Sequence, residues 1–228
     1  MNEIRALLSQ YQAEFYPVVP IDANSDKLII LDLTAANTEL TTEIVNDIER
    51  FSAYIEGYLD QNNARYAIGG YGEHRTMYSR SNLFDTDDEP RCLHLGLDIW
   101  GKPGTPVSAA MDGHVHSLAF NDRFGDYGAT IILRHELENQ TFYSLYGHLA
   151  MADLDLEIGV HIPKGSVFAH FGNPKENGWW PPHLHIQLII DIGNYTGDFP
   201  GVCRYSEREK YLANCPDPDL ICKVYRYV

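Results

Sequence analysis

The chain has 228 residues, of which 44% are hydrophobic, and a formal net charge of −15. This length suits one domain, or one domain with an appended segment, and the apolar fraction excludes a wholly disordered chain. The negative charge argues against nucleic acids, anionic membranes and anionic wall polymers as electrostatic partners.

Targeting and redox signals are few. No stretch approaches the roughly 18 apolar residues of a membrane span, and the first residues lack the basic and apolar regions of a signal peptide. If Met1 is the native start, we expect a cytoplasmic protein; otherwise a periplasmic or extracellular one. Cys92, Cys203, Cys215 and Cys222 do not form Cys-x-x-Cys pairs, so reduced thiols are expected.

Residues 1–65 are predicted to be a mainly helical N-terminal segment. Apolar residues recur at helical spacing up to Phe15, and Pro17 and Pro20 end that pattern. Residues 28–33 form a short apolar run of strand type. Asn37 or Thr38 is expected to cap a second helix, whose buried face carries Ile44, Ile48, Phe51, Ile55 and Leu59.

Residues 66–200 have a β pattern of short apolar strands separated by turn signals, such as Asp112-Gly113. Residues 129–137 and 141–149 are predicted to pair as a hairpin. The pattern favours a mainly β fold built on a twisted antiparallel sheet, barrel-like or sandwich-like, with a helical N-terminal segment. Residues 201–228 are expected to be an extension that wraps this body.

Two histidine motifs indicate metal chemistry. His94 and Asp98 supply a nitrogen and an oxygen ligand, and His183 and His185 share one face of a short strand because side chains two positions apart point the same way. Three such ligands suit a tetrahedral zinc ion whose fourth position holds water. His148, between the two motifs, is a further candidate.

The other histidines are not predicted to be metal ligands or catalytic residues. His114 and His116 form a second His-x-His without an acidic partner motif, and we interpret them as structural or surface residues. His74, His161 and His170 are interpreted as surface or packing residues. His135 is left unassigned, because its strand position suits either solvent or the cleft.

Taken together, the motifs from about 94 to 188 resemble the lysostaphin-like, LytM-type zinc endopeptidases, which hydrolyse bacterial cell-wall peptides. The resemblance rests on several segments in the same order. They are His94-Leu95-Gly96-Leu97-Asp98, Gly104-Thr105-Pro106-Val107, Asp112-Gly113, Gly125-Asp126-Tyr127-Gly128, His135, Tyr146-Gly147-His148-Leu149, Gly159, Gly165 and Pro182-His183-Leu184-His185.

The resemblance implies a fold related to the duplicated hybrid motif and one Zn²⁺ per chain, held by His94, Asp98 and His185. It also implies that His148 and His183 are the two catalytic histidines. Zinc-bound water would attack a peptide amide, with one histidine as acid and base and the other stabilising the oxyanion. Which histidine has which role stays open. The expected substrate is a peptide or peptidoglycan fragment, and the oligomeric state is open.

Two departures from the family pattern affect the groove. Gln187 stands where the family commonly has Glu, which changes the surroundings of the ligands. The approach to His183 is bulky, and Trp179 and Trp180 in it are either a substrate-stacking platform or part of a packed loop. Upstream, Arg75 or Arg80 could bind a substrate carboxylate, and salt bridges to the acidic surface explain them equally well. That upstream stretch could also cover the groove, by family analogy.

Two other functions are considered. A catalytically silent protein of the same fold would bind zinc or a cell-wall fragment without cutting it. Such proteins usually lose ligands, but this chain keeps all three ligand positions and both catalytic histidines. A cupin-type barrel also opens with His-x-His, but it requires a nearby glutamate and a later histidine, and no histidine follows His185. A zinc metallopeptidase is therefore the predicted function.

Overall fold

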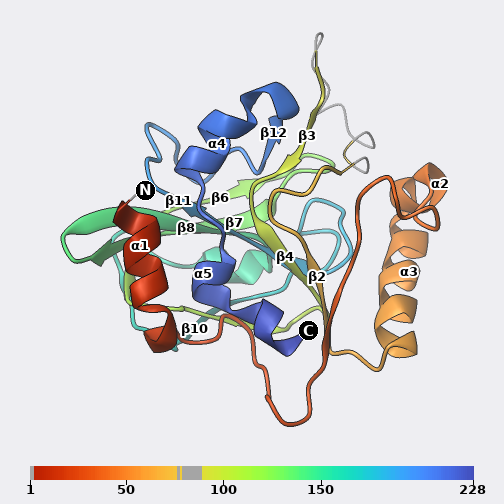
Figure 1. The fold of residues 1–228 in the computed structure, drawn as a ribbon, viewed down its shortest axis with the longest axis horizontal. Helices are drawn as coiled ribbons and strands as arrows, with labels where there is room; N and C mark the ends of the chain where they lie inside the picture. Colours follow the sequence, from red (N-terminus) through yellow and green to blue (C-terminus); the bar gives the residue numbers. More distant parts are fainter. Residues whose placement is uncertain (1–2, 76–77, 79–88) are drawn as a thin grey trace.

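The computed structural model describes residues 3–75, 78 and 89–228 (Figure 1). Within these residues the main feature is an eight-stranded sheet with the order β1-β2-β4-β11-β8-β7-β6-β9. Its strands are β1 (Leu28–Ile30), β2 (Tyr66–Gly69), β4 (Leu97–Trp100), β6 (Gly113–Asn121), β7 (Gly128–Leu137), β8 (Gln140–Leu149), β9 (His161–Ile162) and β11 (His183–Ile189). Two strand pairs lie outside it: β3 (Arg91–His94) with β12 (Val202–Arg204), and β5 (Pro106–Ser108) with β10 (Val167–His170).

The predicted hairpin is present as β7 and β8. Leu137 pairs with Gln140, so only Glu138 and Asn139 form the turn, and both have positive φ angles of 49° and 65°. Two consecutive positive φ values are typical of the tight turns that suit the right-handed twist of paired strands. The hairpin connects to β11 through β8, which places His148 of β8 in the strand beside His183 and His185.

The mainly β class with a helical N-terminal segment is confirmed, with one correction to the barrel-like architecture. The sheet is open, because β1 and β9 end the strand order without pairing with each other. It is also mixed, since β1 pairs with β2 in parallel. The barrel expectation failed because alternating short strands specify antiparallel neighbours but not whether the last strand returns to the first.

The N-terminal segment contains α1 (Glu3–Gln10), η1 (Gln12–Glu14), β1, α2 (Thr42–Asn46) and α3 (Ile48–Gln61). The expected cap at Asn37 or Thr38 is wrong. Thr41 caps α2 and Asp47 caps α3, through side-chain oxygens that accept backbone N–H groups. In each helix the cap is thus a polar residue that lies after Asn37 and Thr38 in the sequence, and it accepts backbone N–H groups of the first turn.

The three predicted sequence segments share a core. Ile4 and Leu8 of α1 and Ile221 of α5 (Asp219–Cys222) belong to the same buried cluster as Leu184 of β11. A second cluster packs Phe51 and Ile55 of α3 against Trp100. The remaining short elements are η3 (Met151–Leu154), η4 (Tyr205–Glu207), α4 (Arg208–Asn214) and η5 (Val224–Tyr227). The boundaries at 65 and 200 stay a prediction.

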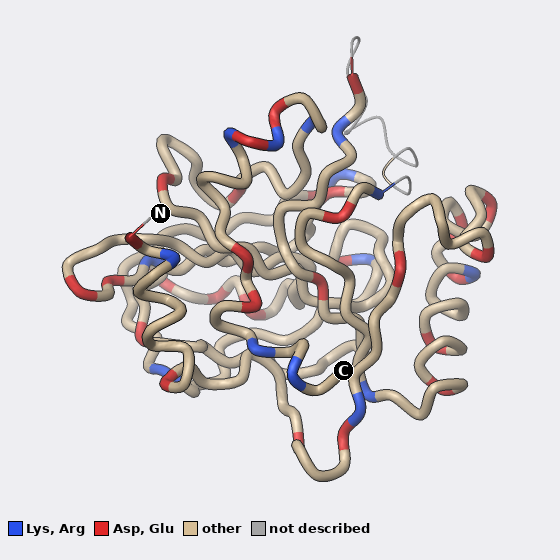
Figure 2. The backbone as a smooth tube through the Cα atoms, viewed as in Figure 1, with Lys and Arg blue, Asp and Glu red and all other residues tan. Residues whose placement is uncertain are grey.

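The distribution of charged and apolar residues does not indicate where a functional site lies. Figure 2 shows acidic positions spread along the whole chain rather than gathered on one face. Among the described residues, none of the helices has the length and apolar character that a bilayer crossing requires.

Candidate metal centre

Three strands bring the predicted ligands together. His94 ends β3, Asp98 lies in β4 and His185 lies in β11, where it is the register partner of Asp98. Gly96 turns the chain between the first two ligands, and a Cβ there would lie 2.4 Å from the His185 ring. Glycine at 96 is therefore required for the close approach of His185 to the other two side chains.

The three donor atoms form a nearly regular triangle. The distances are 3.0 Å from His94 Nε2 to His185 Nδ1, 3.3 Å from His94 Nε2 to Asp98 Oδ1, and 3.0 Å from His185 Nδ1 to Asp98 Oδ1. Bonds of about 2.0–2.1 Å in a tetrahedron separate neighbouring ligand atoms by about 3.3 Å. The spacing of this triangle therefore fits one face of a tetrahedral metal site.

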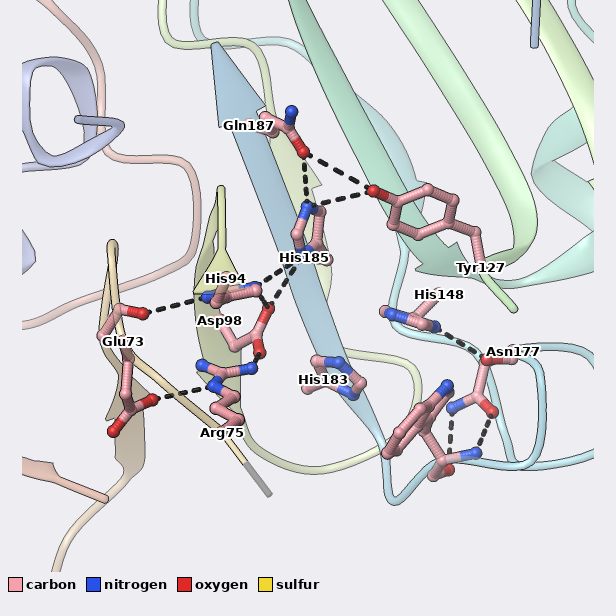
Figure 3. Close-up of polar contacts among 12 residues, drawn as sticks. Glu73, Arg75, His94, Asp98, Tyr127, His148, Asn177, His183, His185 and Gln187 are labelled. Carbon is pink, nitrogen blue, oxygen red and sulfur yellow. Dashed lines mark hydrogen bonds and ion pairs between the residues drawn. The ribbon is translucent and has the colours of Figure 1, made fainter. Parts of the chain in front are cut away.

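The outer nitrogen of each imidazole is held by an acceptor. His94 Nδ1 lies 2.9 Å from the Gly70 carbonyl oxygen. His185 Nε2 lies 3.1 Å from Gln187 Oε1, as Figure 3 shows. Gln187 Nε2 donates to the Pro200 carbonyl, which orients the amide with its oxygen toward His185. The outer nitrogens therefore carry the protons, and both inner lone pairs point at the Asp98 carboxylate.

Burial and charge keep these groups in the protonation states that a metal needs. Burial, assisted by the nearby Arg75 guanidinium, lowers the pKa of His94 to about 4. Burial alone would raise the pKa of Asp98, but His94 and Arg75 outweigh it and hold that pKa well below its usual range. Two lone pairs and a carboxylate converging in a buried place favour a cation between them. The residues present fit a metal ion.

His148 and His183 lie beside this group. Their ring centroids are 4.1 Å apart, and those of His148 and His185 are 6.2 Å apart. His148 Nδ1 donates to the Asn177 carbonyl (2.7 Å) and His183 Nδ1 to the Pro181 carbonyl (2.8 Å). In Figure 3 the other nitrogen of His148 points toward the three ligands.

Both rings are neutral near pH 7. Burial lowers the pKa of His183 to about 4, and burial together with neighbouring His183 lowers the pKa of His148 well below its usual value. His148 also has a positive φ of 63°, a conformation uncommon outside glycine that recurs at functional sites. Each ring therefore offers a lone pair that can accept a proton.

A cavity of about 320 Å³ opens over these residues. Asp98, His148, His183 and His185 line one part of it. The rest is lined by side chains of both charges and by aromatic rings, which include Arg91, Arg123, Asp126, Tyr127, Trp180, Tyr195, Asp198 and Phe199. Its size and mixed lining suit a peptide.

The two predicted substrate-binding tryptophans, Trp179 and Trp180, differ in their exposure and in their relation to the cavity. Trp180 lines the cavity but is only 3% exposed, and its indole N–H donates to the Asp126 carbonyl. Trp179 is 39% exposed and is not among the described residues that line the cavity. The packed-loop interpretation therefore fits Trp180 better, and a substrate-binding role of Trp179 stays a prediction.

Arg75 lies against the candidate ligands and also lines the cavity. Its side chain is 1% exposed and forms ion pairs with Glu73 and Asp98. The salt-bridge interpretation is thus favoured over a substrate contact. The partners of Arg75 are the carboxylates of Glu73 and Asp98, however, and not the acidic surface residues that were expected. Arg80 lies outside the described residues.

Three residues around the site were missed by the sequence interpretation: Glu73, Tyr127 and Asn177. Gln187, which the sequence marked as a change near the ligands, contacts His185 Nε2. Asn177 is fully buried under His148, and the Tyr127 hydroxyl lies 3.4 Å from His185 Nε2. For Asn177 the sequence offered one signal, its position inside the bulky loop that precedes His183. Of the other histidines, His135 is buried and His114 is exposed; in the described part of the chain His94, Asp98 and His185 form the metal-suited cluster.

Comparisons with known proteins agree with this geometry. Residues 93–196 match the model of Peptidase family M23. An uncharacterized metalloprotease of Haemophilus influenzae is 30% identical over 57% of this chain and 27% of its own length. An L-Ala–D-Glu endopeptidase of Bacillus subtilis is 26% identical over 74% of this chain and 63% of its own length. The chain thus spans less than two thirds of these relatives.

Solved structures give a weaker likeness. The catalytic domain of lysostaphin from Staphylococcus simulans aligns over 72% of this chain and 98% of its own, with 18% identity and a TM-score of 0.41. A zinc-containing peptidase from Vibrio cholerae aligns over 42% of this chain and 27% of its own, with 25% identity and a TM-score of 0.34.

Proposed function

We propose that the chain, whose residues 93–196 match the model of Peptidase family M23, is a zinc-dependent metallopeptidase that hydrolyses peptide amide bonds. The observation that carries the proposal is the triangle of His94, Asp98 and His185 donor atoms, 3.0–3.3 Å on each edge. Two imidazoles and one carboxylate are the ligand types of a hydrolytic zinc site with an open position.

Zinc bound there would act as a Lewis acid on the peptide carbonyl and lower the pKa of water. The chain's own residues supply the rest. Gly70 and Gln187 fix the tautomers of the two ligand imidazoles, and Asp98 carries the negative charge of the ligand set.

His148 and His183 handle the proton and the developing charge. A neutral ring with a free lone pair accepts a proton from the attacking water and returns it to the leaving amine, a role worth about 10²–10⁴ in rate. The other ring, after it takes up a proton from solvent on its cavity-facing nitrogen, donates to the negative charge that develops on the carbonyl oxygen. Either histidine could have either role, since the ring centroids of His148 and His183 are only 4.1 Å apart.

The first experiment measures bound zinc and peptide turnover in the same preparations. We expect one zinc per chain in the parent and its loss in His94→Ala, since one of the three ligands is removed. His148→Ala should keep zinc while turnover falls by about 10²–10³-fold. His114→Ala, at an exposed histidine in β6, is the matched control and should keep both.

The substrate is tested separately. The two named relatives with known activities, the L-Ala–D-Glu endopeptidase and a DD-carboxypeptidase/endopeptidase of Neisseria meningitidis that is 31% identical over 43% of this chain, suggest peptidoglycan-derived peptides. Turnover of intact wall sacculi and of soluble wall peptides should be compared. Cleavage of soluble peptides alone favours a cytoplasmic substrate, and cleavage of sacculi alone favours an exported enzyme.

A silent binding protein of the same fold is the alternative. It predicts that the parent takes up zinc and binds wall fragments, yet hydrolyses neither substrate. The two neutral histidines in the cavity favour the enzyme, because a binder has no use for a proton acceptor there.

A further inference from the structure

Residues 70–75 precede the family-matched region and lie along β3; we call them the flanking segment. Gly72 N–H donates to the His94 carbonyl, His94 N–H donates to the Glu73 carbonyl, and Arg75 N–H donates to the Cys92 carbonyl, each at 2.9 Å. The segment is thereby attached to the strand that ends in a candidate ligand. It also carries the Gly70 carbonyl that receives the His94 ring proton.

Arg75 reaches from this segment to a second ligand. Its Nη1 donates to Asp98 Oδ2 at 2.6 Å, while Asp98 Oδ1 faces the two imidazoles. The two oxygens of Asp98 therefore have separate partners: the outer one is bound to Arg75 and the inner one is left for a metal. Figure 3 shows this division, with the guanidinium on the opposite side of the carboxylate from His185.

Glu73 holds the guanidinium in place. Its carboxylate accepts from Arg75 Nε at 2.7 Å and also from the backbone N–H of Leu33 at 3.1 Å. Two carboxylates and one guanidinium leave one net negative charge, the same as Asp98 alone. Glu73 thus offsets the charge of Arg75, which would otherwise repel a cation at the ligands.

From this arrangement we propose that Arg75 is a positioning residue for the metal site: it fixes Asp98 so that a single oxygen faces the ion. The proposal rests on the proposed function, because it presumes that the triangle binds zinc. Arg75 also lines the cavity, but its 1% exposure and its two carboxylate partners favour a role toward Asp98 over a substrate contact. Stability alone is a weak reason for the pair, since buried ion pairs can often be replaced by apolar residues without loss.

The test measures zinc affinity by competition with a chromophoric chelator in metal-free full-length protein. Arg75→Met should weaken zinc affinity about 10–100-fold, the usual effect of removing a group that orients a ligand. Arg75→Lys, which keeps one charge but lacks the fork that joins Asp98 and Glu73, should give an intermediate loss. Arg65→Met is the matched control, since Arg65 also pairs with an aspartate at 2.6 Å but at the surface, and it should keep the parent affinity.

Two further readouts separate positioning from a merely structural role. The visible spectrum of the cobalt(II)-loaded protein should change in Arg75→Met, because the coordination of Asp98 changes. Glu73→Gln should weaken zinc affinity more in the parent than in Arg75→Met, because in the parent Glu73 also holds and neutralises Arg75. Urea unfolding of the metal-free proteins verifies that each variant folds, and Arg75→Lys carries the test if Arg75→Met does not.

The outcomes are distinct. If Arg75→Met, or Arg75→Lys in its place, binds zinc with the parent affinity and gives the parent cobalt spectrum, Arg75 is a structural ion pair and the inference is overturned. If the parent binds no zinc, or His94→Ala binds it equally well, the proposed function itself fails.

Discussion

Asn177 is fully buried under the cavity, and its side chain has three hydrogen bonds. The amide donates to the carbonyls of Gly172 and Trp180, and its oxygen accepts the Trp180 N–H. The backbone carbonyl of the same residue accepts the His148 ring proton. One residue therefore shapes the loop and orients the His148 ring.

Asn177→Ala should lower the free energy of unfolding by about 1–3 kcal/mol, because the buried Trp180 N–H loses its acceptor. Turnover should fall as well, since the carbonyl that holds His148 moves with the loop. Urea unfolding and peptide turnover measure the two effects. Lys175→Ala, at an exposed position of the same loop, should change stability by less than about 0.5 kcal/mol. Equal losses in the two variants would contradict this role for Asn177.

His135 lies apart from the candidate ligands and makes a separate prediction. Its Nδ1–H donates to the Asp112 carbonyl and its Nε2 accepts the Ser144 hydroxyl. Burial lowers the pKa of His135 to about 4, against about 6.5 in the unfolded chain. The folded protein therefore holds fewer protons than the unfolded chain between these two pH values.

It follows that His135 costs no stability above about pH 6.5 and that stability falls as the pH drops toward about 4, by up to about 3 kcal/mol. The measurement is the free energy of unfolding against pH in the parent and in His135→Gln. Over this window the variant should lose less stability than the parent. A parallel pair of curves would show that folding does not change the pKa of His135.

At the scale of elements, the loop before β11 fits against the start of β7. Gly125 N–H donates to the Gly178 carbonyl, and Gly178 has a φ of 83°. A Cβ at 178 would lie 1.8 Å from the Asp126 carbonyl oxygen, which is too close for any side chain. The loop that carries Asn177 is therefore held to the β7 side of the groove by backbone contacts.

Gly178→Ala should destabilise the protein by more than the roughly 1–2 kcal/mol that a left-handed conformation costs an L-residue, because a backbone clash is added. Gly193→Ala is the matched control: its φ is 58°, but open space surrounds it, so only the conformational cost remains. The difference in unfolding free energy between the two variants measures the clash. If the two variants are equally stable, the fit between loop and strand is not tight.

The sequence predicted the elements whose periodicity is strong and missed contacts that depend on distant pairing. The hairpin of β7 and β8, the strand with His183 and His185, and the convergence of His94, Asp98 and His185 follow from alternation and motif order. The Arg75–Asp98 pair could not be predicted, because it depends on how the flanking segment pairs with β3. The barrel expectation failed for a similar reason, since strand closure is a long-range property.

At the scale of the whole molecule, the candidate metal site depends on residues on both sides of the family-matched region. The ligands come from β3, β4 and β11, while Gly70 and Arg75 precede the family-matched region. Pro200 lies after that region and fixes Gln187. The family-matched residues 93–196 thus hold the ligands but not all of their partners.

Zinc binding should therefore stabilise the entire fold rather than one loop. Because the triangle of ligands is absent in the unfolded chain, zinc at about 100 times its Kd should raise the free energy of unfolding by about 2.7 kcal/mol. The measurement is urea unfolding of the full chain at increasing zinc concentrations. His185→Ala, which lacks one ligand, should show no such rise. A rise of equal size in His185→Ala would place the stabilising ion elsewhere, for instance near the exposed His114 and His161, whose rings lie 5.1 Å apart.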